Sequence, residues 1–214
     1  MPSIITHAAV PLALWCAADR GRIPPRLLAA GVVAAMLPDA DVLAFALHIP
    51  YADAFGHRGA SHSLLFACVL AVLAAVLAFF GSRQPWSAPL SSGSRRTWSA
   101  VSCQPRLAPT KAGPTVTSTL QAAVFVFVCA ASHPLLDALT SGGLGVALAW
   151  PWSDHRFFAP WRPIRVSPFA PQFFSTRGLA TLLSELRWVW LPLAGAVIAW
   201  KLIHSAPAAP RDLS

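Results

Sequence analysis

Long apolar runs recur along the chain, separated by polar or proline-rich stretches. A helix needs about 20 predominantly apolar residues to cross the hydrocarbon core of a bilayer. Four runs approach or reach this length, and they cover residues 27–49, 63–81, 120–139 and 188–203. A fifth run, residues 4–18, is shorter, at about 15 residues. The pattern predicts an all-α fold, a polytopic membrane bundle of about four to five transmembrane helices.

The composition agrees with a membrane protein. Of the 214 residues, 56% are hydrophobic and only 11% are charged, which is too apolar for an ordinary soluble domain. The net charge of +8 comes from basic residues in loops between the apolar runs. Such residues are typical of the flanks of membrane helices, so we expect no nucleic-acid partner. The four cysteines show no CxxC spacing, and we interpret them as small hydrophobic residues.

Two segments interrupt the single membrane domain that we expect over residues 1–214. Residues 82–118 are rich in Ser, Pro, Thr and Arg, which predicts a flexible inserted loop. Residues 140–187 mix aromatic residues with arginines and prolines. This mixture favours an interfacial loop at the depth of the lipid headgroups, although an ordinary structured loop with an aromatic core fits it equally well.

Four stretches place histidine and aspartate within or beside the apolar runs. Ionisable groups cost free energy there unless they are paired, hydrated or bound to metal, so they mark function. These stretches contain His7, Asp39, Asp41, His57, His62, His133 and Asp137. If all five segments cross the membrane, alternating helix directions bring the four stretches to one face. Lys and Arg are more numerous on the opposite side, ten against six, so we expect the site to face away from the cytoplasm.

The spacing of these residues has chemical meaning. His133 and Asp137 are four residues apart, so on a helix they share a face and can hold one metal. Asp39 and Asp41 follow Pro38, which disrupts a regular helix and lets one or both carboxylates turn into a cavity. On a regular helix these two side chains would point about 200° apart. A helix-ending cap is the alternative interpretation of this motif.

His57 and His62 flank Arg58, and Ser61 is a candidate N-cap for the helix that follows. Arg58 is placed to clamp a phosphate or another oxyanion. Imidazole and carboxylate ligands without clustered thiols suit a divalent cofactor such as zinc, manganese or iron(II), and their number could serve two metals. A bound metal would acidify a water molecule for attack on an ester. We assign catalytic roles to Arg58 and Asp41.

The same motifs resemble the YdjM-like family, which is described as LexA-binding, inner-membrane-associated, metal-dependent hydrolases. The resemblance rests on residues 6–7, 37–41, 57–63 and 133–140, with further likeness at 160–164, 166–168 and 184–186. It covers most of the chain except residues 82–118, which look like an insertion. The resemblance implies a multi-pass protein of the bacterial inner membrane with hydrolase activity.

Within this resemblance, the His and Asp pattern is similar to that of zinc-dependent phospholipase C and related nucleases, which are helical and hold a zinc cluster. The analogy implies zinc as the first choice of metal and a phosphoester as the substrate. The ligands that it implies are His7, Asp39, His57, His62, His133 and Asp137. The sequence has no second HxxxE or HxxxH motif in the corresponding region, so we do not expect a complete three-metal site.

We therefore predict a membrane-bound, metal-dependent hydrolase that acts on a phosphoester or lipid-linked ester. Two alternatives stay open. The first is a transporter or ion-relay protein that uses the same His and Asp residues, although paired inverted repeats, typical of transporters, are not apparent. The second is a regulatory membrane scaffold that binds a protein partner through its cytoplasmic loops, as the LexA-binding description implies.

Overall fold

The structure is a computed structural model that describes residues 1–19, 21–81, 116–168 and 172–204. The predicted inserted loop, residues 82–118, lies outside the described residues except for its last positions, which begin a helix. The longer helices are α1 (Ala9–Ala17), α2 (Pro25–Met36), α4 (Leu64–Gly81), α5 (Val116–Ala138), α6 (Thr176–Glu185) and α7 (Leu191–His204). The short elements are α3 (Leu43–Ala46), the 3-10 turns η1 (Ile4–Ala8), η2 (Leu37–Val42), η3 (Ala60–His62) and η4 (Gln172–Phe174), and the π-helical turn η5 (Leu186–Trp190).

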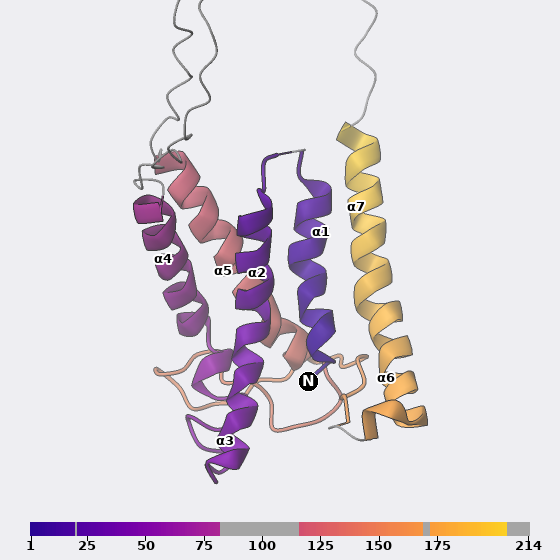
Figure 1. The fold of residues 1–214 in the computed structure, drawn as a ribbon. Coiled ribbons are helices and arrows are strands. Elements are labelled where there is room, and N and C mark those ends of the chain that lie inside the picture. Colours follow the sequence, from indigo (N-terminus) through magenta and orange to yellow (C-terminus); the bar gives the residue numbers. More distant parts are fainter. Residues whose placement is uncertain (20, 82–115, 169–171, 205–214) are drawn as a thin grey trace, which may run out of the picture.

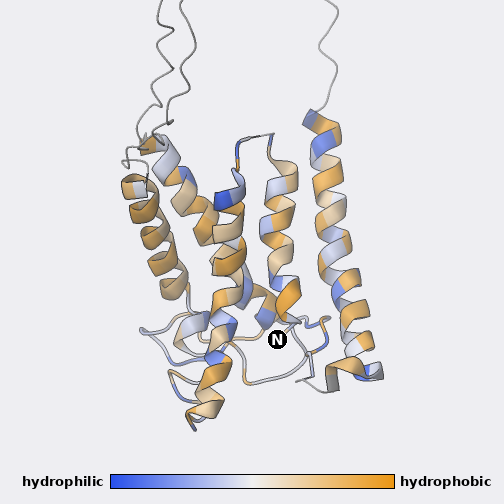
Figure 2. Ribbon diagram, viewed as in Figure 1, coloured by the Kyte–Doolittle hydropathy of each residue, from blue (hydrophilic) through white to orange (hydrophobic). Residues whose placement is uncertain are grey.

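Within the part of the chain that the structure describes, four helical segments are long and apolar enough to cross a membrane. They are Pro25–Ala46, Leu64–Gly81, Val116–Ala138 and Thr176–His204. The helices stand side by side in one bundle, with apolar residues along most of their length (Figure 1, Figure 2). No strand occurs within the described ranges, where β-pairing is limited to two isolated bridges. The predicted all-α membrane bundle is therefore confirmed.

The first helical segment, Ile4–Ala17, is shorter than the four spans. It nevertheless stands upright in the bundle, with α1 in contact with both α2 and α7. It leads from the end of the bundle where η1 lies to the opposite end, where α2 begins (Figure 1). The four polar stretches can meet at one end only if this segment reverses the direction of the chain. The fold meets this condition.

The last span begins earlier than the apolar pattern predicts. We expected a helix from residue 188 and a loop over 140–187, but residues 176–185 form α6, which continues through η5 into α7. Ser175 begins this helix by accepting a hydrogen bond from the backbone N–H of Arg177 at 3.3 Å. Several polar residues within α6 lower its hydropathy, which is why an apolar run alone did not find it.

Small side chains allow α2, α4 and α5 to pack closely. Ala35, Ala67 and Cys129 are almost fully buried where these helices meet. Gly31 of α2 lies so near α5 that an added Cβ would come within 2.4 Å of Phe125. The buried Cys129 fits the predicted role of cysteine as a small hydrophobic residue. This part of the bundle holds α2 and α5 in a fixed relation.

Candidate metal centre

Four chain segments deliver the predicted polar residues to one end of the bundle (Figure 1). His7 lies in η1, Asp39 in η2 and His62 in η3, while His133 and Asp137 lie in the last turns of α5. The helix continues past Pro134, and this keeps His133 and Asp137 on one face. All five side chains are buried, with relative exposures of 2% for Asp39 and 0% for the others. The fold therefore brings these five predicted residues together at one end of the bundle.

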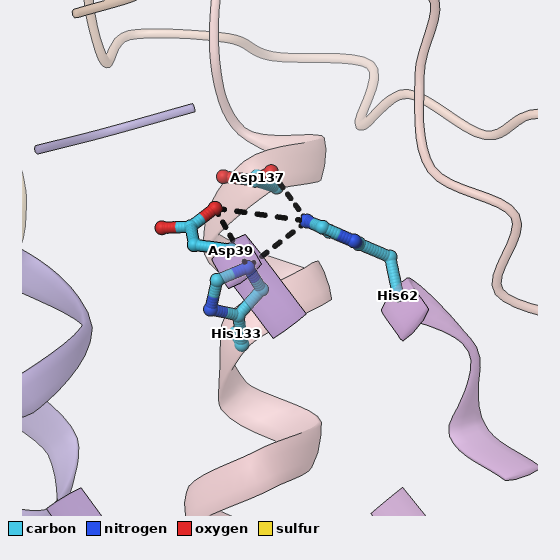
Figure 3. Close-up of side chains that lie close together, drawn as sticks. All are labelled: Asp39, His62, His133 and Asp137. Carbon is cyan, nitrogen blue, oxygen red and sulfur yellow. Dashed lines mark hydrogen bonds and ion pairs between the residues drawn. The ribbon is translucent and has the colours of Figure 1, made fainter. Parts of the chain in front are cut away.

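Asp39, His62, His133 and Asp137 form a compact group, here called the four-residue cluster (Figure 3). One potential ligand atom from each residue lies within 4.8 Å of those of the other three. The Nε2 atom of His62 lies 3.3 Å from Asp137 Oδ2 and 3.0 Å from Nε2 of His133, which in turn lies 3.5 Å from Asp39 Oδ1. Two ligands bound to one zinc ion at tetrahedral angles lie about 3.4 Å apart. The spacing fits a single divalent ion.

Hydrogen bonds on the far side of each imidazole ring fix which nitrogen faces the cluster. His133 Nδ1 lies 2.7 Å from the carbonyl oxygen of Ala35, which only accepts, so Nδ1 carries the proton. His62 Nδ1 lies 3.1 Å from Asp41 Oδ2, again an acceptor. In their neutral forms, both rings therefore direct an Nε2 lone pair into the same space. This arrangement is typical of metal-ligating histidines.

Without a metal, a proton can bind at Nε2 of His62. Burial acts against protonation of His62, but the adjacent carboxylates of Asp137 and Asp41 outweigh it and raise the pKa of His62 to about 9. A metal ion entering the cluster must displace this proton, since both compete for the same lone pair.

Several buried polar atoms around the cluster lack any hydrogen-bond partner among the described residues. They are both ring nitrogens of His7, both carboxylate oxygens of Asp39 and both of Asp137. Burying such groups without partners costs several kcal/mol for a charge. Arg58 Nε lies 3.1 Å from Asp137 Oδ2, but the geometry is unsuitable for a hydrogen bond, so the contact is only electrostatic. A bound cation would satisfy the oxygens that the protein leaves unpaired.

Asp41 and His57 lie behind the cluster. Asp41 Oδ1 lies 2.5 Å from His57 Nδ1, and Asp41 Oδ2 accepts hydrogen bonds from the Arg58 N–H at 2.9 Å and from Ser61 Oγ at 2.7 Å. Because Oδ2 also contacts His62, the carboxylate orients that ring. His57 was predicted as a ligand, but the fold joins it to Asp41 and leaves it outside the four-residue cluster. Asp41, predicted as catalytic, likewise lies outside the cluster and contacts it through His62.

Ser61 was predicted as the N-cap of the following helix, and this prediction was wrong. The hydroxyl of Ser61 donates a hydrogen bond to Asp41. Ser63 caps the helix instead, because its Oγ accepts a hydrogen bond from the backbone N–H of Phe66 at 3.1 Å in the first turn of α4. The start of the helix is shifted by the 3-10 turn η3, which continues to His62.

Arg58 is fully buried and its guanidinium is engaged within the protein. Its Nη1 donates to the carbonyl oxygen of Gly142 at 2.9 Å, and its Nη2 donates to Thr140 Oγ1 at 3.1 Å. We expected this side chain to clamp an oxyanion. In this conformation the guanidinium instead holds Asp137 and the segment that follows α5.

The aromatic and Arg-rich segment predicted as interfacial passes across this end of the bundle; we call residues 140–168 the covering segment (Figure 1). Arg156 ties it to the loop before η3. Its guanidinium donates to the carbonyl oxygens of His57 and Arg58, at 3.2 Å each, and of Tyr51 and Asp53, at 3.2 and 3.0 Å. The arginine therefore fixes the backbone that carries the residues behind the cluster.

Glu185 is a buried residue near the site to which the sequence assigned no role beyond the family likeness at residues 184–186. Its carboxylate accepts hydrogen bonds from Ser3 N and Ser3 Oγ at 2.5 Å and from Thr6 Oγ1 at 2.7 Å, and the residue is 1% exposed. These contacts hold the segment that precedes His7. The available signal was an isolated acid in an otherwise leucine-rich stretch, residues 179–186, but residue 185 fell within a predicted loop.

Comparisons with known proteins agree with this architecture. The chain is 45% identical over 193 residues to the Inner membrane protein YbcI of Escherichia coli (strain K12), covering 90% of this chain and 92% of that protein. No solved structure matches the chain. The similarity to zinc-dependent phospholipase C is not shown by these comparisons and stays a prediction. A family model described as YdjM inner membrane protein matches residues 1–208, and the chain therefore belongs to this family.

Proposed function

We propose that this inner-membrane protein is a metal-dependent hydrolase that acts on a phosphoester or a lipid-linked ester. The observation that carries the proposal is the set of buried carboxylate oxygens without hydrogen-bond partners, on Asp39 and Asp137, opposite the two imidazole lone pairs. The donor set of nitrogen and oxygen suits zinc first, and manganese or iron(II) next. When bound, such an ion lowers the pKa of a water molecule and polarises an ester oxygen.

The side chains have distinct tasks in this proposal. Asp39, His62, His133 and Asp137 hold the ion. Asp41 keeps the His62 ring in the tautomer that offers Nε2. The other residues of the predicted ligand set, His7 and His57, do not belong to this first group of ligands.

The position of the cluster bears on the kind of substrate. It lies at one end of the spanning helices, with polar residues at that end of the bundle (Figure 2). An ester near the lipid headgroups would meet the protein at this depth. Because the four side chains are at most 2% exposed, a substrate can reach them only when the surrounding segments move. The covering segment is the nearest candidate, since Gly142 and Thr140 bond to Arg58.

The proposal is tested with purified protein in lipid nanodiscs. Metal content after loading with zinc or manganese is measured for the wild type and for Asp39→Asn and Asp137→Asn, beside hydrolysis of a chromogenic phosphodiester. We expect metal in the wild type, loss of both metal and hydrolysis in the two variants, and no change in Asp53→Asn. Asp53 is a suitable control because it is exposed and, among the described residues, its carboxylate accepts only the local N–H of Phe55.

Two outcomes would contradict the proposal. A wild-type protein that binds no metal after loading excludes a metal-dependent enzyme. Metal that binds and crosses the bilayer of proteoliposomes, without hydrolysis of any phosphodiester or carboxylic ester, favours the transporter or ion-relay alternative.

A further inference from the structure

We propose that the site holds two cations, bridged by Asp39 and Asp137, with His7 as a ligand of the second. This inference rests on the proposed metal-dependent function and adds a position outside the four-residue cluster. His7 was implied as a ligand by family likeness alone. The geometry now places its Nε2 beside one oxygen of Asp39 and one of Asp137.

The two carboxylates face two sides. On the first side, Asp39 Oδ1 lies 3.5 Å from His133 Nε2, and Asp137 Oδ2 lies 3.3 Å from His62 Nε2. On the second side, Asp39 Oδ2 lies 3.6 Å and Asp137 Oδ1 lies 3.7 Å from Nε2 of His7. Each aspartate therefore offers one oxygen to each side, as bridging carboxylates do. The separations on the second side match the roughly 3.4 Å between two ligands of one tetrahedral ion.

His7 is a buried imidazole whose nitrogens form no hydrogen bond among the described residues. Its ring is 0% exposed, and neither ring nitrogen has a hydrogen-bond partner. Its contacts with the two carboxylates, at 3.6 and 3.7 Å, are too long for hydrogen bonds. A ring that served only to fill space would be better replaced by an apolar side chain, because burying unpaired polar atoms costs free energy.

The stacking of His7 on His133 places the two rings side by side at a separation compatible with two neighbouring ions. The two ring centroids lie 3.7 Å apart, with an interplanar angle of 21°. Two nearly parallel rings at this distance can direct their nitrogens to two neighbouring ions. Paired metals that share carboxylate bridges lie about 3.5–4 Å apart. The stacked pair therefore matches the spacing of a two-metal site.

The net charge of the site depends on the number of bound ions. Asp39, Asp41 and Asp137 contribute three carboxylates around the two positions, and Arg58 contributes one guanidinium. One divalent ion would neutralise this set, whereas two would leave positive charge. An anionic group such as a phosphate would balance that excess, so the two-ion form fits the phosphoester branch of the proposed function.

The test counts ions and measures their coupling. Protein in nanodiscs is loaded with Mn²⁺, and bound metal is quantified beside electron paramagnetic resonance spectra. We expect two ions per chain and an exchange-coupled signal in the wild type. His7→Phe keeps a ring to stack on His133 but has no ligand, so we expect one ion and the signal of isolated Mn²⁺. His155→Phe, at an exposed histidine, should behave as the wild type.

Each contrary result has a separate meaning. One ion per wild-type chain, with no exchange coupling, overturns the second position but leaves the hydrolase proposal intact. Two coupled ions in His7→Phe also overturn it, because His7 would then not be a ligand. No bound ion in the wild type overturns both proposals. If His7→Phe does not fold, the wild-type spectrum alone still decides, and His7→Gln provides a smaller polar replacement.

Discussion

At the scale of single residues, Asp41 sets the direction of the donor atoms without joining the cluster. Its carboxylate is held by His57, Ser61 and the backbone of Arg58, and it fixes the far nitrogen of His62. Such supporting carboxylates raise the basicity of a histidine ligand and hold the orientation of its ring. The loss of one should weaken metal binding without abolishing it.

We therefore predict that Asp41→Asn lowers metal affinity by about 10–100-fold. The amide keeps the shape of the side chain but removes its charge and one acceptor. Affinity is measured by competition with a chelator, and Asp39→Asn should have the larger effect because it removes a direct ligand. An unchanged affinity in Asp41→Asn, with the exposed Asp53→Asn as control, would show that His62 is oriented by other contacts.

Gly143 offers a second test at this scale, because it lies where Arg58 and Tyr51 meet the covering segment. Its φ is +92°, and an added Cβ would lie 2.7 Å from Arg58 Nη1 and 3.0 Å from the Tyr51 hydroxyl. Arg58 cannot easily withdraw, since it is buried and bonded to Gly142 and Thr140. A methyl group there must disturb the guanidinium that faces Asp137.

We expect Gly143→Ala to be less stable than Gly21→Ala by about 1–3 kcal/mol. Both positions have positive φ, so both variants carry similar backbone strain, but a Cβ at Gly21 would meet nothing within 4 Å. The difference therefore isolates the contact with Arg58 and Tyr51. Thermal unfolding in nanodiscs measures it, and equal melting temperatures for the two variants would contradict the prediction.

The cluster could be predicted from sequence to the extent that its members are ionisable residues in apolar surroundings. His133 and Asp137 also had helical spacing. The approach of both Asp39 and Asp41 to His62 was left open by the sequence, because a regular helix would point them about 200° apart while Pro38 could let one or both turn into a cavity. The fold uses a 3-10 turn over Leu37–Val42, in which three residues complete a turn. Because the backbone departs from a regular α-helix there, the carboxylates of Asp39 and Asp41 both lie within 4.0 Å of the His62 ring.

At the scale of elements, the position of Asp39 relative to α5 depends on how closely α2 packs on that helix. Gly31 makes this approach possible, since a Cβ there would lie 2.4 Å from Phe125 Cε1 and 3.0 Å from Cys129 Sγ. Asp39 follows α2 in the same continuous span, Pro25–Ala46. A displacement of α2 should therefore reach the proposed metal ligands.

We predict that Gly31→Ala destabilises the protein by about 1–3 kcal/mol, as overpacking does in well-packed cores, and weakens metal binding. Gly195→Ala in α7 is the matched control, because nothing lies within 4 Å of its added Cβ. Thermal unfolding and metal affinity are measured for both. A Gly31→Ala protein as stable as the control would show that the contact with Phe125 relaxes without cost.

The number and place of the main spans could be predicted from apolar runs, but α6 could not. Its residues are partly polar, and their burial depends on contacts with a segment some 180 positions away, as between Glu185 and Ser3. Such long-range pairs leave no local pattern in a single sequence. The same reason explains why Glu185 was not identified as part of the site region.

At the scale of the whole molecule, we propose that the metal site faces away from the cytoplasm. The excess of Lys and Arg on the opposite side supports this orientation, and the fold places the ligands at one end of the bundle (Figure 1). Metal loading would then occur from the extracytoplasmic side. The proposal concerns the direction of insertion only and is independent of the number of ions.

We predict that a membrane-impermeant maleimide applied to spheroplasts labels Trp152→Cys and not Asp19→Cys, in a chain whose native cysteines are replaced. Trp152 is 78% exposed in the covering segment, and the side chain of Asp19, between α1 and α2 at the opposite end, is 81% exposed. Permeabilised cells should show labelling of both. The reverse pattern in spheroplasts would place the site on the cytoplasmic side.

The hydrogen bonds between Glu185 and the segment before His7 also constrain the order in which the site is completed during synthesis. The residues of the four-residue cluster are all present once α5 has been made, whereas the partner of Ser3 and Thr6 arrives only with α6. A nascent chain can therefore assemble the four-residue cluster before the segment that precedes His7 has gained its contacts with α6. The packing of α7 against α1, together with the hydrogen bonds of Glu185 to Ser3 and Thr6, then fixes the segment before His7.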